Sequence, residues 1–244
     1  VAILKHLNPC GAAVAGTLTE ALVGAKQGDP RSHFGGIIAA NQEIDAACAN
    51  EIAKDFTEIV VAPSYSTEAK DILAKKKNVR VIELDFDKPA RREMRSVEGG
   101  MLIQEPDPGV SSIAQAELQT ERALSEQEKI DLQLAWVLCA HLKSNAICLV
   151  SNGMLLASGA GQMSRIDAVE VALMKAETHG HSLEGAVAAS DAFFPFPDCV
   201  EVLAAAGVQA IIVPGGSKGD DAVVSKAKEL GISLLFAADR HFRH

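Results

Sequence analysis

Short apolar runs alternate with amphipathic stretches along most of the chain. The runs Glu58–Pro63 and 79–84 flank a stretch with helical spacing, 67–76, which predicts a strand, a helix and a second strand. The same order returns later, with predicted strands at 208–214 and 232–236 around a predicted helix at 220–230 that stops at Gly231. In both cases the first strand ends in proline, so the pattern recurs 151 residues later (63 to 214).

The similarity between the two halves extends towards the N-terminus. Predicted helices at 17–27 and 167–178 each follow a glycine-containing turn, and each half continues with a phenylalanine-containing loop, 29–36 or 190–198. We therefore predict the α/β class with two related lobes, 1–85 and 130–244, joined by an inter-lobe connection, 86–129, that is rich in turn residues such as Lys88-Pro89. Because ligands of such folds bind beyond the carboxyl ends of strands and between domains, we expect a site on these loops.

Composition narrows the function classes. Apolar residues make up 48% of the chain and charged residues 23%, which is ordinary for a globular protein and excludes a disordered one. The net charge of −9 argues against nucleic acid or an anionic membrane as a partner, and no apolar run is long enough to span a bilayer. Five scattered cysteines without a C-x-x-C pair predict reduced thiols in the cytoplasm.

The start of the chain is unusual. It lacks an initiating Met and opens directly in an apolar run, Val1–Leu4, that predicts a buried strand. A domain rarely begins within a strand, so we expect the sequence to be a fragment of a longer protein.

The first candidate for chemistry is the pair Lys5-His6 directly after that strand. Histidine suits proton abstraction near neutral pH, and an adjacent ammonium can stabilise developing negative charge. A surface lysine beside a turn-capping histidine is the alternative interpretation. Pro9-Cys10 resembles part of the zinc-deaminase signature, but Ala13 stands where the second cysteine is required and the glutamate is missing, so that zinc site is excluded.

Three further segments could contact a ligand. Gly35-Gly36 permits close backbone approach, or is an ordinary turn before a strand. Asn145, within 143–147 at a predicted helix-to-strand junction, could pair with an amide or ring nitrogen, or simply form a turn. The glycine-rich segment 159–165 precedes a helix and ends in Arg165, which favours an anion site.

The last two candidates lie near the C-terminus. Three phenylalanines within 190–198 could enclose a heteroaromatic ligand, or pack into the core. The basic segment Arg240–His244 could be a frayed tail, but an apolar strand precedes it, so we expect it to be tied down.

Six motifs in one order resemble the AICAR transformylase domain of the AICAR transformylase/IMP cyclohydrolase family. They are Lys-His-x-x-Pro-x-Gly from Lys5, Asp-Pro-x-Ser-x-Phe-Gly-Gly from Asp29, Lys-Ser-Asn-Ala-Ile from Lys143, Gly-Ala-Gly-Gln-Met-Ser-Arg from Gly159, Ser-Asp-Ala-Phe-Phe-Pro-Phe from Ser190, and the terminal Arg-His-Phe-Arg-His. The resemblance runs from Val1 to His244. It implies a cytidine-deaminase-like fold, duplicated within the domain, without the deaminase zinc.

The resemblance also implies an activity. The family transfers a formyl group from 10-formyltetrahydrofolate to the 5-amino group of AICAR, giving FAICAR in purine biosynthesis. By matching motif, His6 resembles the general base, Lys5 the cation that assists the tetrahedral intermediate, and Asn145 the residue that holds AICAR and the formyl oxygen. The implied substrate contacts are Phe34, Gly35, Glu58, Arg165, Phe193 and Arg240, and the implied folate contacts are Ile166, Phe193, Phe196 and Asp198.

Departures from the family pattern qualify these expectations. The cyclohydrolase domain and the upstream segment that supplies an arginine to the AICAR phosphate are absent, and Pro197 stands where arginine is common. Lys143 and Ala146 stand where potassium-binding relatives have neutral polar residues, so we expect no bound metal. The family resemblance implies a homodimer with sites at the interface. A catalytically impaired nucleotide- or folate-binding module of the same fold is the alternative, and a hydrolytic deaminase is a remote third.

Overall fold

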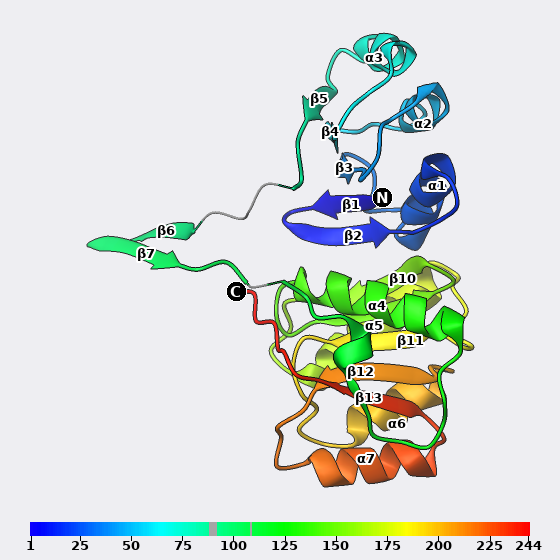
Figure 1. Cartoon of the computed structure of the whole chain (residues 1–244), viewed down its shortest axis with the longest axis vertical. Coiled ribbons are helices and arrows are strands. Elements are labelled where there is room, and N and C mark those ends of the chain that lie inside the picture. The colour runs from blue at the N-terminus through cyan, green and yellow to red at the C-terminus, as the bar shows by residue number, and fades with distance from the viewer. Residues whose placement is uncertain (88–91, 108) are drawn as a thin grey trace.

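The chain forms two α/β lobes, which lie one above the other in Figure 1. The computed structural model describes residues 1–87, 92–107 and 109–244. The predicted turn residues Lys88, Pro89 and Pro108 lie outside the described residues.

The first lobe is a five-stranded sheet with helices on one side. Its strand order is β2-β1-β3-β4-β5, with β3, β4 and β5 parallel and β1 antiparallel to both β2 and β3. The elements are β1 (Ala2–Lys5), β2 (Asn8–Ala12), α1 (Leu18–Gly28), β3 (Ile37–Ala39), α2 (Ala46–Ile52), β4 (Ile59–Ala62), α3 (Thr67–Ala74) and β5 (Arg80–Glu83).

The second lobe repeats that order of elements after an additional helix. Its sheet runs β10-β9-β11-β12-β13-β8, with β11, β12 and β13 parallel and β9 antiparallel to both β10 and β11. The elements are α4 (Glu126–Ala140), β9 (Ile147–Ser151), β10 (Met154–Gly159), α5 (Arg165–Thr178), β11 (Val187–Ser190), α6 (Asp198–Ala205), β12 (Ala210–Pro214), α7 (Asp220–Glu229) and β13 (Ser233–Ala237).

The strands and helices predicted from the hydrophobic pattern are confirmed, including both strand–helix–strand units that end the lobes. Local sequence explains several boundaries. Thr17 begins α1 with a capping box to Glu20, Ser164 caps α5 through the Asp167 amide, and Ser125 begins α4 with a capping box to Glu128.

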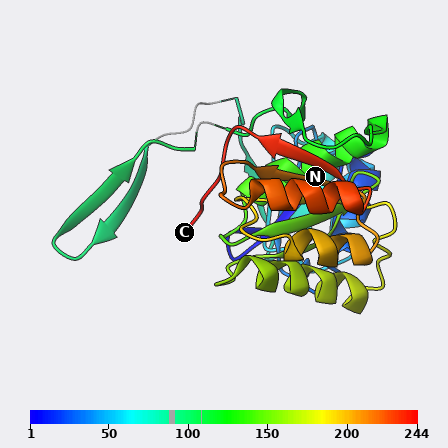
Figure 2. The same cartoon turned by 90° about the horizontal axis from the view of Figure 1, so that it is seen from below.

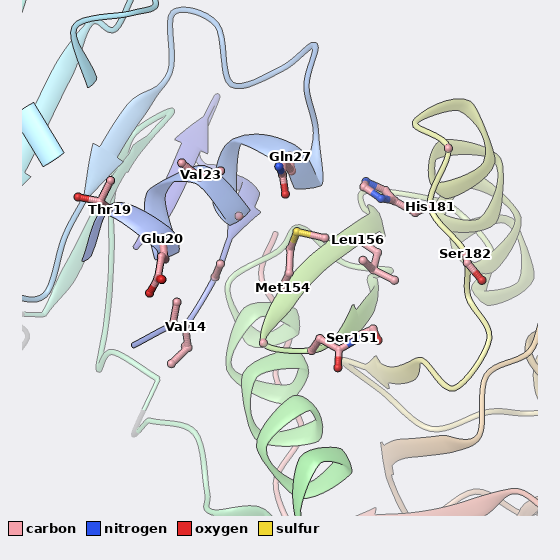
Figure 3. A pocket seen from close by; sticks show the side chains of 16 residues that line it. Val14, Thr19, Glu20, Val23, Gln27, Ser151, Met154, Leu156, His181 and Ser182 are labelled. Carbon is pink, nitrogen blue, oxygen red and sulfur yellow. Dashed lines mark hydrogen bonds between the residues drawn. The ribbon is translucent and has the colours of Figure 1, made fainter. Parts of the chain in front are cut away.

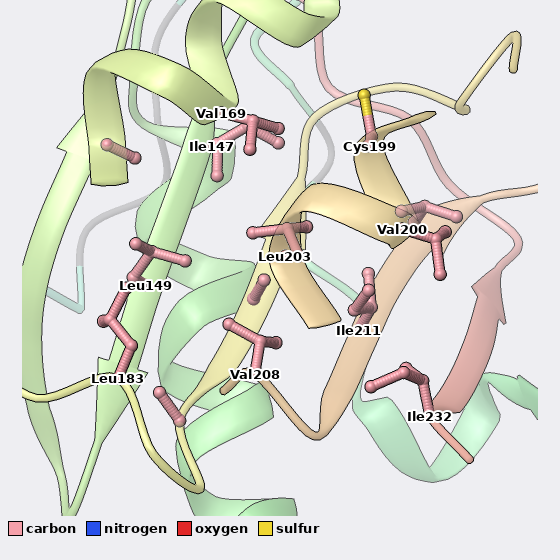
Figure 4. Close-up of a cluster of buried hydrophobic side chains, with 14 of the residues drawn as sticks. Ile147, Leu149, Val169, Leu183, Cys199, Val200, Leu203, Val208, Ile211 and Ile232 are labelled. Carbon is pink, nitrogen blue, oxygen red and sulfur yellow. The ribbon is translucent and has the colours of Figure 1, made fainter. Parts of the chain in front are cut away.

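The sheet of the second lobe is covered on both faces. On one face of the sheet, alternate strand residues such as Ile147, Leu149 and Ile211 form a hydrophobic cluster with α5, α6 and α7 (Figure 4). On the opposite face, the intervening strand residues, such as Val150 and Ile212, pack with α4. Alternation of side chains along a strand produces this division, and burial of both faces is typical of parallel sheets.

The sheet of the first lobe is covered across its width on one face only. Ile3, Ile38 and Val60 are buried against the helices of this lobe. Their neighbours in the strands, which point to the opposite face, remain partly exposed: Leu4, Ile37, Ile59, Val61 and Ile82. Among the described residues only the β1–β2 edge of that face is covered, where Ala2 and Ala12 pack with the cluster that contains α4.

The connection between the lobes contains more structure than the sequence predicted. A hairpin of β6 (Glu93–Val97) and β7 (Gly100–Gln104) projects away from both lobes (Figures 1 and 2). A 3₁₀ turn, η1 (Ile113–Gln115), and the short strand β8 (Glu117–Leu118) follow, and β8 pairs with β13 at the edge of the second sheet. The predicted boundaries at 85 and 130 remain a prediction.

Candidate functional site

The turn between β1 and β2 carries the candidate base. Lys5 pairs with Asn8 across the hairpin, so His6 and Leu7 form its two-residue turn, with positive φ angles of 51° and 68°. Left-handed backbone costs about 1–2 kcal/mol for each L-residue, and such strain is concentrated at functional sites. The turn holds His6 out at the surface, where its imidazole is exposed.

Lys5 connects this turn to the first phenylalanine loop. Its ammonium donates to the Phe34 carbonyl at 2.6 Å. Gly35 adopts a φ of +68° and donates its amide to the Phe56 carbonyl at 2.8 Å, which turns the chain into β3. The Phe34 ring is 57% exposed and lies 5.5 Å from the Phe56 ring, so an apolar face remains open beside the Lys5 ammonium.

Glu58 lies next to this loop but already has a cationic partner. Its amide donates to the Gly36 carbonyl at 3.1 Å, and its carboxylate accepts from Arg80 at 2.8 Å. The structure therefore brings Lys5, Phe34, Gly35 and Glu58 to one end of the first sheet.

Asn8 joins the two lobes at the site. Its side-chain oxygen accepts the Lys143 amide of the second lobe at 3.0 Å, and its nitrogen donates to the His6 carbonyl at 3.2 Å. The turn that carries His6 is thereby fixed beside the 143–147 segment that carries Asn145. The sequence analysis did not single out Asn8.

Asp191 is the centre of the site in the second lobe. Its carboxylate is fully buried and accepts from the Ser144 hydroxyl, from the Arg165 guanidinium and from the Ala146 amide, the last at 2.9 Å. Its carbonyl accepts the His241 amide at 3.1 Å. Three segments far apart in the sequence, those of Ser144–Ala146, Arg165 and His241, thus converge on this one residue at the carboxyl end of β11.

Arg165 lies in the interior and not at the surface of the site. Its side chain is 7% exposed, and its guanidinium donates to Asp191, to the Ala146 carbonyl at 3.0 Å and to the Asn145 side-chain oxygen at 2.7 Å. The adjacent Ile166 is half-buried and packs against the core of the second lobe.

The phenylalanine loop after Asp191 divides its rings between core and surface. Phe194 is buried in the second-lobe core, whereas Phe193 is half-buried and Phe196 is 65% exposed. The core interpretation therefore holds for Phe194, and enclosure of a ligand by the other two rings stays a prediction. Asp198 begins α6, and its carboxylate accepts the Cys199 amide at 2.7 Å.

The C-terminal segment is tied down, as expected. The Ser144 amide donates to the Arg243 carbonyl at 3.0 Å, and the buried His241 ring contacts Asp107 at 2.7 Å. Arg240 stays exposed, with its guanidinium carbon 5.5 Å from the centre of the Phe242 ring. The tail is therefore held against Ser144 through the backbone of Arg243.

Two kinds of chemistry receive no support. Burial raises the pKa of the Cys10 thiol to about 11, so it is protonated at neutral pH and a poor nucleophile. Among residues 1–87, 92–107 and 109–244, no group of three or more His, Cys, Asp or Glu side chains could hold a metal ion. In the same residues no helix has the length and apolar character that a membrane span requires.

A separate cavity of about 580 Å³ lies between the lobes (Figure 3). Val14, Thr19 and Gln27 line it from the first lobe, and Ser151, Met154 and His181 from the second. None of the predicted site residues lines it. The site is thus identified by its polar network and not by this cavity.

Known proteins resemble this chain along its whole length. A family model described as AICARFT/IMPCHase bienzyme matches residues 1–175. A bifunctional purine biosynthesis protein PurH from Lysinibacillus sphaericus is 47% identical over 243 residues, which are 99% of this chain and 47% of that protein. One from Roseobacter denitrificans is also 47% identical, over 253 residues, and covers 100% of this chain and 48% of the relative. The chain thus spans about half the length of the curated relatives it matches.

Solved structures match more weakly. A dCMP deaminase from the cyanophage S-TIM5 is 22% identical and covers 46% of this chain and 98% of its own, with a TM-score of 0.32. A diaminohydroxyphosphoribosylaminopyrimidine deaminase/reductase from Thermotoga maritima is 20% identical and covers 44% of this chain and 34% of its own, with a TM-score of 0.29. The family model covers most of the chain and the sequence identity to the relatives extends over nearly all of it, and we conclude that the chain belongs to the AICARFT/IMPCHase bienzyme family.

Proposed function

We propose that this chain is an AICAR formyltransferase, which passes the formyl group of 10-formyltetrahydrofolate to the 5-amino group of AICAR. Family membership supports the reaction class. The observation that carries the proposal is the convergence of the His6 turn, Asn145 and the C-terminal tail through Asn8, Ser144 and Asp191. The residues proposed as base and cation come from the first lobe and the proposed polar anchor from the second, and the hydrogen bond between Asn8 and Lys143 supports their placement in one site.

The chemistry of the substrate explains why these groups are needed. The 5-amino group of AICAR is a poor nucleophile because its lone pair is delocalised into the ring and the carboxamide. Orientation, proton removal and oxyanion stabilisation must therefore supply the acceleration. In this proposal the amine attacks the formyl carbon while His6 takes the amine proton, and Lys5 stabilises the negative charge on the formyl oxygen. The bond between the formyl carbon and N10 then breaks, and the proton held by His6 passes to N10, which gives FAICAR and tetrahydrofolate. The Phe34 carbonyl occupies one Lys5 hydrogen and leaves two for that purpose.

The proposed contacts divide between the two substrates. The contacts to AICAR would come from Phe34, Gly35, Glu58, Arg165, Phe193 and Arg240. The folate contacts would come from Ile166, Phe193, Phe196 and Asp198, where the exposed Phe196 ring offers a stacking surface. No metal enters this scheme.

Formyl transfer itself tests the proposal. The purified chain, given both substrates, should release tetrahydrofolate only when AICAR is present. Binding of AICAR without any transfer would instead support the impaired binding module. Absence of both binding and transfer would contradict the proposal.

Arg240 gives a prediction about binding. Replacing Arg240 by alanine should weaken AICAR binding by roughly 1–3 kcal/mol, because a charge-assisted contact to an anion is lost. Isothermal titration calorimetry measures it. Arg92→Ala is the control, since Arg92 is exposed and pairs with Glu105 at 2.7 Å. An unchanged dissociation constant for Arg240→Ala would remove this residue from the site.

We further propose that the chain forms a homodimer. The β6–β7 hairpin has every residue exposed, and an isolated two-stranded hairpin is marginally stable in water. Cross-strand register puts Met94, Met101 and Ile103 on one face of it. The first sheet also leaves an apolar face uncovered. A second copy of the chain would bury both surfaces at once.

The hairpin provides a test of the dimer. The double variant Met101→Lys/Ile103→Lys should raise the dimer dissociation constant tenfold to a hundredfold, roughly the cost of placing two charges in an apolar interface. Sedimentation equilibrium measures it. Leu102→Lys is the matched control, because register places Leu102 on the other face of the hairpin. Equal effects of both variants, or a monomeric parent chain, would contradict the proposed surface.

The fold and location are proposed with the function. We propose a cytidine-deaminase-like fold, duplicated into two lobes, because both sheets share one strand order and the same alternation with helices. Five free cysteines favour a reducing compartment, which supports the cytoplasm.

A further inference from the structure

One side chain of the C-terminal segment is buried, although the residues around it are exposed. His241 is 2% exposed, whereas Arg240 and residues 242–244 lie at the surface. The segment follows β13 and belongs to no helix or strand, so a regular backbone ladder does not fix its path. Within residues 240–244, the imidazole is therefore the side chain that inserts into the fold.

Two distant parts of the chain hold this imidazole. Its Nδ1 lies 2.7 Å from the carboxylate of Asp107, in the connection between the lobes. An ionised carboxylate only accepts, so Nδ1 carries the hydrogen and donates it. The ring also meets the edge of Trp136 on α4, with ring centroids 5.0 Å apart and 62° between the planes.

The two rings also complement each other chemically. Nε2 of His241 and Nε1 of Trp136 are both buried, and neither has a hydrogen-bond partner within the described part of the chain. A neutral imidazole protonated on Nδ1 presents Nε2 as an acceptor, whereas the indole N–H only donates. The buried donor of one ring thus lies beside the buried acceptor of the other.

The tail binds the second lobe mainly through its backbone. The His241 amide donates to the Asp191 carbonyl at 3.1 Å, and the Arg243 carbonyl accepts the Ser144 amide at 3.0 Å. Because backbone groups repeat at every residue, similar bonds could form if the segment slid by one position. Phe242 has no donor for Asp107, and Arg240 has a longer, permanently charged side chain. The side chain of His241 therefore selects the register.

We infer that His241, held by Asp107 and packed on Trp136, is a positioning residue that fixes the register of the C-terminal segment and thereby places Arg240. We call the contact of these first three residues the tail latch. Consecutive Cα atoms are about 3.8 Å apart, so a slip of one residue would move Arg240 further than a hydrogen bond tolerates. The consequence for AICAR rests on the proposed function, in which Arg240 contacts the substrate. The latch itself does not.

The fluorescence of Trp136 tests the tail latch without any substrate. Trp136 is the only tryptophan of the chain, and it is fully buried. Asp107→Ala should shift its emission to the red and raise the acrylamide quenching constant at least about threefold, because the released tail opens a path to the indole. Asp107→Asn should stay close to the parent chain, since its amide oxygen still accepts from Nδ1. Unchanged quenching in Asp107→Ala would overturn the inference.

Glu105→Ala is the matched control for these variants. Glu105 lies in the same connection, is exposed, and pairs with Arg92 at 2.7 Å. Its replacement removes a carboxylate from the connection but leaves the tail latch intact. Emission and quenching should therefore remain those of the parent chain, and a shift as large as that of Asp107→Ala would contradict the assignment to Asp107.

Binding of AICAR tests the placement of Arg240. Asp107→Ala should weaken it about tenfold in the parent chain but less than about twofold in an Arg240→Ala background, because residues that act through one another are not additive. Asp107→Asn should bind nearly as the parent does. Equal weakening in both backgrounds would overturn the positioning role.

Trypsin cleavage separates failure of this inference from failure of the proposed function. A parent chain that binds no AICAR would refute the proposed function. In that case, cleavage after Arg240 should still be at least about tenfold faster in Asp107→Ala than in the parent, because the opened tail is the cleavable form. Equal cleavage rates would show that the latch does not fix the tail and would overturn the inference.

Discussion

Replacement of His6 by alanine is expected to lower kcat for formyl transfer by roughly a hundredfold to ten-thousandfold, the range that a positioned general base contributes. AICAR binding should stay within about tenfold of the parent, because a base acts mainly in the transition state. The substitution should change the stability of the fold little, because the turn is exposed and His6 makes no contact with the core. Left-handed backbone is as unfavourable for alanine as for histidine. The substitution therefore removes the imidazole without relieving the backbone strain of the turn.

Single-turnover kinetics and calorimetry measure the two effects separately. His181→Ala is a suitable control, because His181 also contacts a backbone carbonyl, that of Gly28 at 3.2 Å, but lies in the separate inter-lobe cavity. It should retain turnover. Loss of binding and of turnover in equal measure by His6→Ala would show that His6 binds the substrate and is not its base.

The sequence predicted the repeated strand–helix–strand units because their signals are local. Both runs before Pro63 and Pro214 are apolar, and an amphipathic stretch follows each. The β6–β7 hairpin was missed although Gly99-Gly100 stands between two short runs, because charged residues interrupt their alternation. The strand β8 was also missed, because two residues are too few to show the alternation of apolar and polar positions that predicts a strand.

The site was less predictable than the fold for a physical reason. The motifs identified Lys5 and His6 as polar residues after a strand and Asn145 as one before a strand, but the segments that carry them are linked by long-range hydrogen bonds. Asn8 reaches a residue 135 positions away, and Arg165 points inward only because Asp191 lies 26 positions further on. An arginine that begins a helix after a glycine-rich turn suggests an anion site. Only the three-dimensional structure shows that Arg165 pairs with the buried Asp191 carboxylate.

That buried carboxylate gives the second large expected effect. Asp191→Ala should lower the free energy of unfolding by about 3–5 kcal/mol, because it leaves the Arg165 guanidinium buried without its counter-ion. The Ser144 hydroxyl and the Ala146 amide lose their acceptor as well. For a chain of this size the melting temperature should fall on the order of 10 °C. Urea titration and thermal denaturation measure the two quantities.

Two further variants separate the unpaired charge from the general cost of losing a buried acceptor. Asp131 is also buried and accepts the Asn152 and Gly153 amides, at 2.9 and 2.6 Å, but within the described part of the chain it pairs with no cation. Asp131→Ala should therefore cost less, about 1–3 kcal/mol. Adding Arg165→Met to Asp191→Ala should restore part of the lost stability, because the uncompensated charge is removed and the apolar chain fills the space. A double variant less stable than Asp191→Ala would mean that Arg165 stabilises the fold through Asn145 and Ala146 alone, and that its pairing with Asp191 is not what holds the site together.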